Sequence, residues 1–455
     1  MNSSAATARR KPNGWAERVA VSPARAAGFR ILMRVERESS YADELLHSTR
    51  SAGLSQPDLN LTTEITMGVL RWRSLLDAAI TRLTSTGIAK LDLEVLTALR
   101  MGAYQLAFLD RIPPHAIVHE SVELVKSAKK RSAAGMVNAV LRKMPPGRAA
   151  LQSAEDSVAL QWAHPEWLVK RWTATFGPEK TLAICRFDQT IPSTILRATT
   201  TDAAEELRKA GIQCEPGRLL KNALVVKSGD ASHSDTLLRG DVAIQDEGSQ
   251  LIAALVGPGS RILDCCAAPG GKTAALADAW PEASIVAAEL HPHRARLLRE
   301  RVPQPNVEIL TADALQLPWG AAFDRVLADV PCSGTGTLAR NPEIKWRLKP
   351  EDLADLQTKQ IAILIAAMKH VAPGGRLVYS TCSLEPEENE QVVTACLKAN
   401  PGFRIIPIAG ELEKLRSSGE LVWHDINGLI SGDYLRTLPG VHPCDGFFAA
   451  VLAVT

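Results

Sequence analysis

Two cysteine motifs, fifty residues apart, carry the side chains best suited to covalent chemistry. Cys332 lies in D-V-P-C-S-G-T-G (residues 329–336), and Cys382 lies in Y-S-T-C-S (residues 379–383). A cysteine thiolate is strongly nucleophilic near neutral pH and is also a good leaving group. Each motif follows an apolar stretch typical of a buried parallel strand. We therefore expect both thiols just beyond the carboxyl ends of neighbouring strands, where they can act on one substrate.

A glycine-rich turn upstream predicts a site for a nucleotide-like cofactor. The sequence D-C-C-A-A-P-G-G-K-T occupies residues 264–273, and its glycines let the backbone turn tightly and approach a ligand closely. Glu289 ends the next predicted strand and Asp313 follows the one after it, where they can accept hydrogen bonds from ribose hydroxyls and from an adenine amino group. The turn lacks the G-x-G-x-x-G pattern of NAD dehydrogenases and fits S-adenosylmethionine better. The residues predicted to contact the cofactor are Cys266, Ala267, Ala268, Pro269, Gly270, Gly271, Lys272, Glu289, Asp313 and Asp329.

The elements that must position these motifs extend from residue 241 to residue 455. Predicted strands alternate with helices that begin near Thr273, His291, Lys349 and Pro386, which indicates a mainly parallel sheet covered on both faces. An apolar hairpin, Phe403–Ile408 with Phe447–Val454, is expected to add antiparallel strands. The predicted parallel strands are Arg261–Asp264, Ser284–Glu289, Val307–Leu310, Phe323–Asp329 and Arg376–Ser380.

The first third of the chain has a helical pattern almost throughout. Ser22-Pro23 is typical of a helix start, and Pro145-Pro146-Gly147 marks the end of the predicted domain, residues 22–147. About seven helices are expected, including separate ones over 61–72 and 74–84. Residues 1–150 hold 22 Lys and Arg against 13 Asp and Glu, which suggests contact with a polyanion as one reading and a solvated helical surface as the other.

One basic cluster in this domain is a candidate RNA contact. Lys126, Lys129 and Lys130 are spaced for one helix face, and Arg131 is adjacent. Contact with RNA phosphates is the more specific interpretation, and a solvent-exposed helix face is the alternative.

Two further segments complete the predicted organisation. Residues 1–21 form a basic N-terminal tail, and residues 151–240 have the weak signals of a small mixed α/β linking module. The chain has no apolar run long enough to span a membrane, no hydrophobic signal segment and no zinc-like cysteine spacing. These observations predict an intracellular, cytoplasmic protein with free thiols, without a membrane segment or a metal site.

The motifs resemble those of the RNA cytosine-C5 methyltransferases. The resemblance rests on D-x-P-C-S-G-T-G, on R-N-P-E-I-K-W at residues 340–346, on Y-S-T-C-S followed by P-E-E-N-E at 386–390, and on the cofactor turn. The helical domain resembles the NusB-type RNA-binding fold. Stretches such as L-D-R-I-P-P-H at residues 109–115 are similar to bacterial 16S rRNA methyltransferases of the Sun/Fmu type. The resemblance therefore covers nearly the whole chain.

The resemblance implies a role for each catalytic candidate. Cys382, in the T-C-S motif, is implied to add to C6 of cytosine, which makes C5 nucleophilic enough to take the methyl group of S-adenosylmethionine. Cys332 is implied to assist product release, and Asp329 is implied to hold N3 of the target base. Lys272 and Lys345 are implied to position or support this arrangement electrostatically.

The expected protein thus has an all-α NusB-like domain, a small α/β linking module and a Rossmann-like S-adenosylmethionine-dependent methyltransferase domain, residues 241–455. Its expected product is 5-methylcytosine in 16S rRNA, in naked or partly assembled form because the target base must be unpaired or flipped out. Two alternatives remain: the same reaction on tRNA, and a non-catalytic rRNA-binding assembly factor. A binding protein, however, needs neither Cys332 nor Cys382.

Overall fold

The computed structural model describes residues 21–38, 40–50, 53–153 and 156–455. Except for Val21, the predicted basic tail lies outside these residues. The described chain forms two compact units: the first contains residues up to 69 and 76–152, and the second contains 70–75 and 153–455. None of the described helices is long and apolar enough to cross a membrane.

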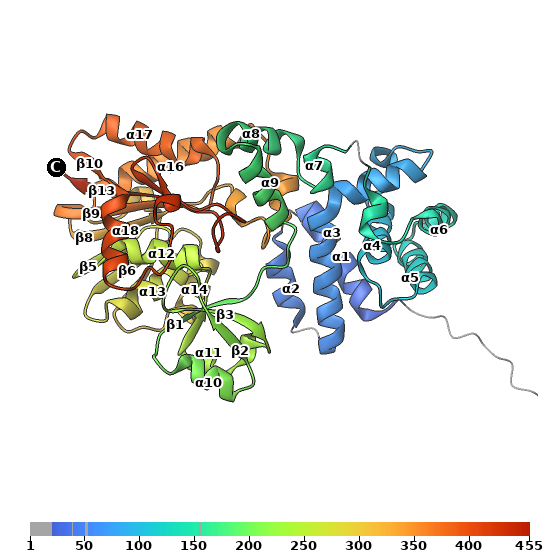
Figure 1. Ribbon diagram of the computed structural model, residues 1–455, viewed down its shortest axis with the longest axis horizontal. Helices are drawn as coiled ribbons and strands as arrows, with labels where there is room; N and C mark the ends of the chain where they lie inside the picture. The colour runs from blue at the N-terminus through green and yellow to red at the C-terminus, as the bar shows by residue number, and fades with distance from the viewer. Residues whose placement is uncertain (1–20, 39, 51–52, 154–155) are drawn as a thin grey trace, which may run out of the picture. The chain divides into compact units, whose positions relative to one another are not determined.

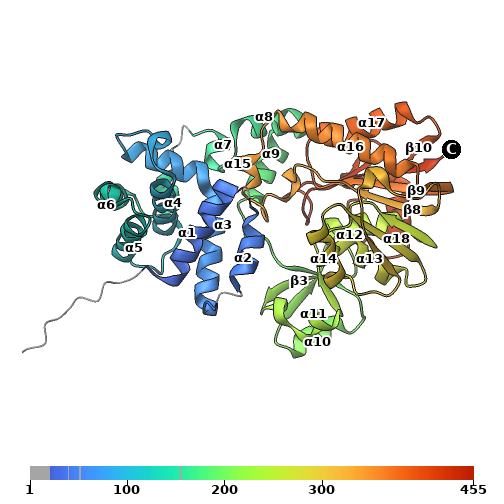
Figure 2. The same cartoon turned by 180° about the vertical axis from the view of Figure 1, so that it is seen from behind.

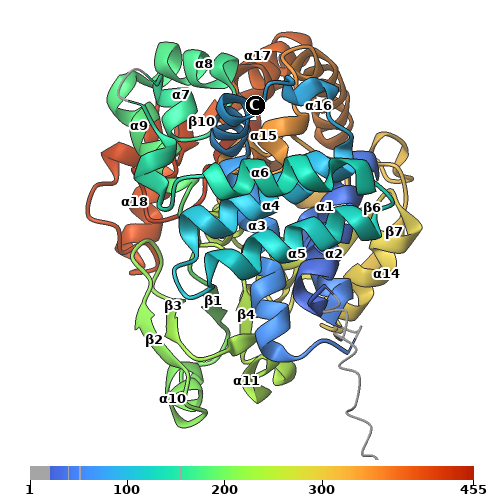
Figure 3. The same cartoon turned by 90° about the vertical axis from the view of Figure 1, so that its right-hand side faces the viewer.

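The first unit is helical, as predicted, and Figure 3 shows α4, α5 and α6 within it. The central helix α4 is almost entirely buried because apolar residues surround it on all sides. Gly68 of α3 lies against it so closely that a Cβ atom there would fall 1.9 Å from the Tyr104 ring, so only glycine permits this approach. The helices are α1 (Pro23–Glu38), α2 (Ala42–Arg50), α3 (Gln56–Leu83), α4 (Leu93–Phe108), α5 (Pro114–Ser127) and α6 (Ala134–Lys143).

One prediction for this unit is wrong. The two helices expected over residues 61–72 and 74–84 are a single helix, α3, which begins after the capping residue Ser55 and runs to Leu83. Neither proline nor glycine occurs between Val69 and Leu83, so nothing in the sequence interrupts the backbone hydrogen bonds there. The first helix does begin at Pro23 as predicted, although the Ser22 hydroxyl donates to Glu120 Oε2 across the unit.

The second unit begins with a small α/β module. Its four-stranded antiparallel sheet has the order β2-β3-β1-β4 and is packed against two short helices, α10 and α11, as Figure 1 shows in green. The elements of residues 158–244 are α7 (Val158–Gln161), α8 (Glu166–Phe176), α9 (Pro178–Phe187), β1 (Ile195–Ala198), α10 (Ala203–Lys209), β2 (Gln213–Pro216), β3 (Ala223–Ser228), α11 (Asp235–Arg239) and β4 (Val242–Ile244).

A nine-stranded sheet forms the rest of the second unit. Its order is β11-β12-β13-β9-β8-β5-β6-β7, and β10 pairs with β13. The strands from β9 to β7 are parallel, whereas β13 is antiparallel to both β9 and β10, which confirms the predicted C-terminal hairpin. The strands are β5 (Arg261–Asp264), β6 (Ser284–Glu289), β7 (Val307–Thr311), β8 (Phe323–Asp329), β9 (Val371–Thr381), β10 (Phe403–Ile406), β11 (Ile430–Ser431), β12 (Tyr434–Arg436) and β13 (Phe448–Val454).

Helices cover both faces of this sheet. Alternate strand residues face opposite sides, so that Leu327 and Val378 pack with α12, α13 and α18, whereas Val326 and Leu377 pack with α16 and α17. Figure 2 shows these two layers of helices. This is the doubly wound arrangement in which ligands bind beyond the carboxyl ends of the strands. The helices are α12 (Glu247–Val256), α13 (Gly271–Ala279), α14 (Pro292–Arg301), α15 (Ile344–Arg347), α16 (Asp352–Met368), α17 (Glu390–Ala399) and α18 (Ile408–Ser417).

Candidate active site

The two cysteine loops leave the sheet side by side. Strands β8 and β9 are parallel neighbours, and their pairing ends with Asp329 opposite Ser380. Beyond this pair, the Sγ atoms of Cys332 and Cys382 lie 3.3 Å apart and both side chains are partly exposed. The structure therefore brings together the two thiols that the sequence analysis selected, at the edge of the sheet where it expected them.

The close approach of the two thiols affects the acidity of Cys332. A hydrogen bond to Cys382, together with burial, raises the pKa of the Cys332 thiol well above its ordinary value. Cys332 consequently keeps its proton and can donate it toward the sulfur of Cys382. The arrangement suits one thiol to act as nucleophile and its neighbour to act as proton donor.

An acid and a lysine lie beside the cysteine loops. Lys272 Nζ donates to Asp329 Oδ2 at 2.7 Å, and Ser380 Oγ donates to Asp329 Oδ1 at 2.7 Å, so both carboxylate oxygens are oriented. Burial alone would lower the pKa of Lys272, but the charge and hydrogen bond of Asp329 outweigh it and raise that pKa. Lys272 is thus held as a cation next to the acid.

The predicted cofactor turn connects β5 to the start of α13. Asp264, at the end of β5, accepts from Thr273 Oγ1 at 2.7 Å and thereby ties the strand to the helix. Burial raises the pKa of Asp264 to about 6. Gly270 has a φ of 106°, and a Cβ there would lie 2.8 Å from Leu298 and Val302, so the turn requires glycine at this position. The first backbone N–H groups of α13 have no carbonyl partner within the helix and are suited to an anionic group.

The two predicted acids lie at the ends of the next strands. Glu289, only 5% exposed, ends β6, and its Oε1 accepts from His291 N at 2.9 Å. Asp313 follows β7 and caps a short 3₁₀ turn by accepting from Leu315 N at 2.9 Å. Because the sheet order is β5-β6-β7, these carboxylates line the same edge as the turn. Their contact with a cofactor stays a prediction.

Lys345 is not placed with the thiols, contrary to expectation. Its ammonium group is buried and donates at 2.9 Å to the backbone oxygens of Arg71 and Ala163 within the second unit. Burial lowers its pKa to about 7, and its strongest favourable charge interaction is with buried Asp188. The α15 turn directs Lys345 into the packed interior, so the structure supports a structural role for it instead of a catalytic one.

The basic cluster of the first unit is also arranged differently from the prediction. Helix α5 ends at Ser127, and Lys129 has a positive φ of 64°, so Lys129 and Lys130 do not continue the helix face of Lys126. Lys130 N donates to Val125 O, which closes the helix end, and its side chain forms an ion pair with Asp92. The predicted single face is therefore wrong, because the chain turns after Ala128.

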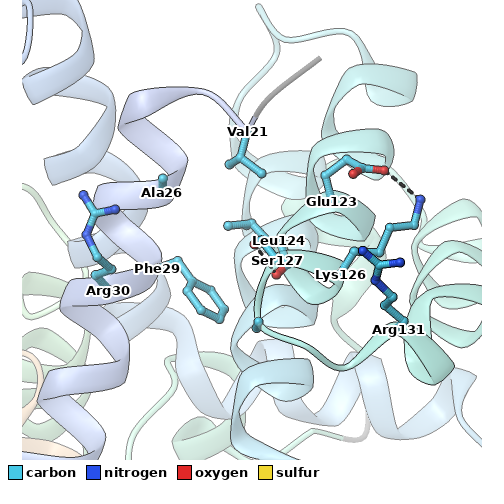
Figure 4. A pocket seen from close by; sticks show the side chains of 10 residues that line it. Val21, Ala26, Phe29, Arg30, Glu123, Leu124, Lys126, Ser127 and Arg131 are labelled. Atoms are coloured by element: carbon cyan, nitrogen blue, oxygen red, sulfur yellow. Dashed lines mark hydrogen bonds and ion pairs between the residues drawn. The ribbon is translucent and has the colours of Figure 1, made fainter. Parts of the chain in front are cut away.

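Two of these basic residues nevertheless line a groove. Figure 4 shows Lys126 and Arg131 on one side of it and α1 on the other, with Phe29 and Arg30. Lys126 is paired with Glu123 at 2.7 Å. The groove is open, mixes an apolar floor with a net positive rim, and lies within the first unit.

The C-terminal segment contributes a part of the site that the sequence analysis missed. Gly446 N donates to Gly336 O at 2.7 Å, and a Cβ on Gly336 would lie 2.2 Å from Gly446 O, so the segment packs directly on the Cys332 loop. The Phe447 ring lies 5.2 Å from Lys272 Nζ. Asp445 accepts from Arg340 at 2.8 Å. In the sequence, the feature that could have indicated this contact is Asp445-Gly446 immediately before an apolar strand. By itself this pair indicates only where a strand begins.

Comparisons with known proteins agree with this architecture. A family model described as 16S rRNA methyltransferase RsmB/F matches residues 254–453, a NusB family model matches residues 22–145, and a ferredoxin-like domain model of RsmF/B-like methyltransferases matches residues 164–231. These three matches correspond to the large sheet, the helical unit and the small module.

Individual relatives match over most of their length. The chain is 32% identical over 436 residues to a probable ribosomal RNA small subunit methyltransferase B of Bacillus subtilis, covering 92% of this chain and 95% of that protein. It is 36% identical over 369 residues to ribosomal RNA small subunit methyltransferase B of Pseudomonas syringae, covering 78% and 82%. The crystal structure of PH0851 shares the fold, with a TM-score of 0.77, 22% identity, and coverage of 94% of this chain and 98% of that one. These matches confirm the resemblance inferred from the motifs. The chain is an RNA methyltransferase with a NusB-like domain, a ferredoxin-like module and a Rossmann-like domain, and it belongs to the RsmB/F family of 16S rRNA methyltransferases.

Proposed function

We propose that this protein methylates C5 of a cytosine in 16S rRNA with S-adenosylmethionine, and that Cys382 is the nucleophile. The observation that carries the proposal is the pair of thiols 3.3 Å apart beside the Lys272–Asp329 ion pair. Cytosine C5 is itself a poor nucleophile, so a nucleophile must first add to C6 to activate it. A cysteine thiolate is suited to this addition.

Each thiol has one task in the proposed reaction. The Cys382 thiolate forms a bond to C6, and the electron pair of the C5–C6 double bond becomes available at C5. C5 would bond to the methyl carbon as the methyl–sulfonium bond breaks, with a neutral thioether as the leaving group. Loss of the C5 proton to a base then restores the double bond and breaks the C6–sulfur bond. Cys332 lies close enough to supply a proton to the departing sulfur, which supports a role in release.

Asp329 and Lys272 are proposed to prepare the base for attack. The ion-paired carboxylate of Asp329 can only accept hydrogen bonds, so it would hold N3 of the cytosine in its protonated form; the positive charge on the ring then draws electron density from C6 and favours addition of the thiolate. Ser380 and Lys272 orient its two oxygens, and the charge on Lys272 also stabilises negative charge that develops nearby. These contacts support a fixed orientation of the Asp329 carboxylate.

The residues of the turn fit S-adenosylmethionine. The start of α13 presents backbone N–H groups to a carboxylate such as the one on the methionine part of this cofactor. We expect Glu289, at the end of β6, to accept from the ribose hydroxyls and Asp313, after β7, to accept from the adenine amino group. When bound, the cofactor supplies an electrophilic methyl group on a sulfonium ion.

The helical unit is proposed to bind the RNA. The groove beside α1 and α5 contains Arg30, Lys126 and Arg131, which can contact phosphates, and Phe29, which offers an aromatic surface to a base. The target cytosine must be unpaired or flipped out to reach Cys382, which favours naked or partly assembled rRNA as the substrate.

Methylation of defined RNAs tests the proposal. The purified protein and isotopically labelled S-adenosylmethionine are incubated with unmodified 16S rRNA or with unmodified tRNA, and bisulfite sequencing then locates any 5-methylcytosine. We expect one modified cytosine in 16S rRNA and none in tRNA. Modification of tRNA alone would overturn the substrate, and label at an atom other than C5 would overturn the reaction. Binding without any transfer would favour a non-catalytic assembly factor.

A further inference from the structure

Glu388 is a fully buried carboxylate that connects the two cysteine loops. It is 0% exposed and lies in the short turn Pro386–Glu388, after the Cys382 motif and before α17. The mechanism described above assigns no task to it. A buried acid of this kind is expected to have strong hydrogen-bonding partners, because leaving it unpaired would be costly.

Its partners are the residues that directly follow the two cysteines. Glu388 Oε1 accepts from Ser333 N at 2.8 Å, and Oε2 accepts from the hydroxyls of both Ser333 and Ser383. The two serine hydroxyls are themselves 3.0 Å apart. One carboxylate therefore binds the residue after Cys332 and the residue after Cys382 at the same time.

Gln360 of α16 extends this network to the other side of Cys332. Its Nε2 donates to Glu388 Oε1 at 2.8 Å and to Pro331 O at 3.0 Å. Gln360 is 0% exposed, so water does not compete for these bonds. We call Glu388, Gln360, Ser333 and Ser383 the Glu388 clamp; it holds both neighbours of Cys332 and the residue after Cys382.

The ladder between the two strands that carry the thiols stops short of both of them. The paired ladder between β8 and β9 ends at Asp329 and Ser380, before either cysteine is reached. Beyond it, the loops are joined by the backbone bond from Gly336 N to Cys382 O at 2.8 Å, by Thr335 Oγ1, which accepts from Leu384 N at 2.9 Å, and by the Glu388 clamp. Among these contacts, the Glu388 clamp binds the residues that directly follow both cysteines, so it is suited to set the separation of the sulfurs.

We propose that Glu388 is a positioning residue that keeps Cys332 and Cys382 in reacting register. The expected effect of Glu388 on methyl transfer rests on the proposed function, whereas its effect on the separation of the two sulfurs does not. A thiol displaced by about 1 Å can lose on the order of a hundredfold in rate, because attack requires close alignment. Glu388 touches neither substrate nor cofactor in this proposal.

The rate at which Cys332 and Cys382 form a disulfide reports on the relative position of their sulfurs, and its measurement needs no RNA. Diamide oxidises the two thiols: both lose their protons, a sulfur–sulfur bond forms, and the N=N bond of diamide is reduced to N–N with two N–H bonds. Peptide mass mapping then gives the rate at which the Cys332–Cys382 linkage appears. We expect Glu388→Ala to slow this rate by about tenfold or more, because the sulfurs no longer share one fixed geometry.

Methyl transfer provides the second readout. Glu388→Ala should lower kcat by roughly a hundredfold while the affinity for S-adenosylmethionine stays unchanged. Glu388→Gln should restore most of both rates, because its amide oxygen can still accept from Ser333 N and Gln360 and its amide group can donate to the serine hydroxyls. The matched control is Glu385→Ala, which removes a buried acid of the same segment that binds Arg171 and Trp172. The control should change neither the rate of linkage nor kcat.

The outcomes separate the two proposals. If wild-type protein methylates no RNA but Glu388→Ala still slows the linkage, the proposed function fails and the clamp stands. If Glu388→Ala forms the linkage and methylates RNA at wild-type rates, the clamp is overturned. Should Glu388→Ala not fold, the double variant Ser333→Ala/Ser383→Ala removes the donors to Oε2 and must show the same slow linkage. A wild-type rate in that double variant would also overturn the clamp.

Discussion

Lys272 and Asp329 form a partly buried ion pair, 2.7 Å between Nζ and Oδ2, that connects the first turn of α13 with the end of β8. The residues are 57 positions apart in the chain. The pair joins the turn predicted to hold the cofactor to the loop that carries Cys332. It is therefore a side-chain contact that couples the two halves of the proposed site.

Replacing Lys272 by Met should damage catalysis more than binding. The change leaves the carboxylate of Asp329 without its cation, so we expect methyl transfer to fall by a factor of about 10²–10³. Single-turnover transfer to RNA measures the rate, and calorimetry measures cofactor affinity. Lys349→Met, a change at an exposed lysine outside the site, is the control. An unchanged rate in Lys272→Met would exclude a catalytic contribution from the pair.

Replacing Cys382 by Ala should abolish methyl transfer. Without the thiolate no bond to C6 can form, so we expect the rate to drop by more than about 10³, while cofactor affinity is retained. The buried Cys396 gives a matched control, because Cys396→Ala removes a thiol that lies in the core between α16 and α17. Normal turnover in Cys382→Ala would show that another group is the nucleophile.

Replacing Cys332 by Ala should trap the enzyme on its RNA. The attacking sulfur would still add to the base, but the neighbouring proton donor would be missing, so release should become slow. A protein–RNA adduct that survives a denaturing gel is the expected result. The double variant Cys332→Ala/Cys382→Ala is the control and should show no adduct. Full turnover without an adduct in Cys332→Ala would contradict the release role.

Replacing Lys126 and Arg131 by Ala should weaken RNA binding by the full chain. For each phosphate that the variant no longer neutralises, the slope of log affinity against log salt should fall by roughly one unit or slightly less. Filter binding or anisotropy at several salt concentrations measures this slope. Lys227→Ala, in the small module, removes a lysine that pairs with Glu215 and serves as the control. Unchanged slopes in the double variant would place the RNA-binding surface elsewhere.

Replacing Lys345 by Met should destabilise the protein instead of disabling its chemistry. Removal of the buried cation takes away the favourable charge interaction with Asp188 and one donor to each of two backbone oxygens, which should lower the free energy of unfolding by about 3 kcal/mol. Thermal unfolding measures this change, and Lys345→Met/Asp188→Asn should recover part of it. Active-site titration then compares turnover per folded molecule. Abolished turnover at unchanged stability would restore the catalytic role that the sequence suggested.

Much of the large domain could be predicted because its signals are local. Apolar runs of strand length alternate with helical patterns, so the bounds of β5, β6 and β8 agree with the predicted strands. The carboxyl ends of parallel strands meet at one edge, so motifs that follow them had to converge there. The approach of Cys332 to Cys382 was expected from this topology, and the pairing of β8 with β9 brings it about.

Other features depended on contacts between distant parts of the chain. The motif containing Lys345 resembles a catalytic one, but the packing of α15 determined that its ammonium group reaches backbone oxygens in the interior. Lys130 was spaced for a helix face, but the chain turns after α5 and this lysine instead pairs with Asp92.

The sequence alone therefore determined which residues could do the chemistry and at which edge of the sheet they would gather. Only the tertiary structure decided their partners, such as Glu388 between Ser333 and Ser383, or Phe447 over Lys272. The physical reason is that strand and helix periods are set by neighbouring residues, whereas the direction of a side chain and its hydrogen bonds are set by whatever packs against it.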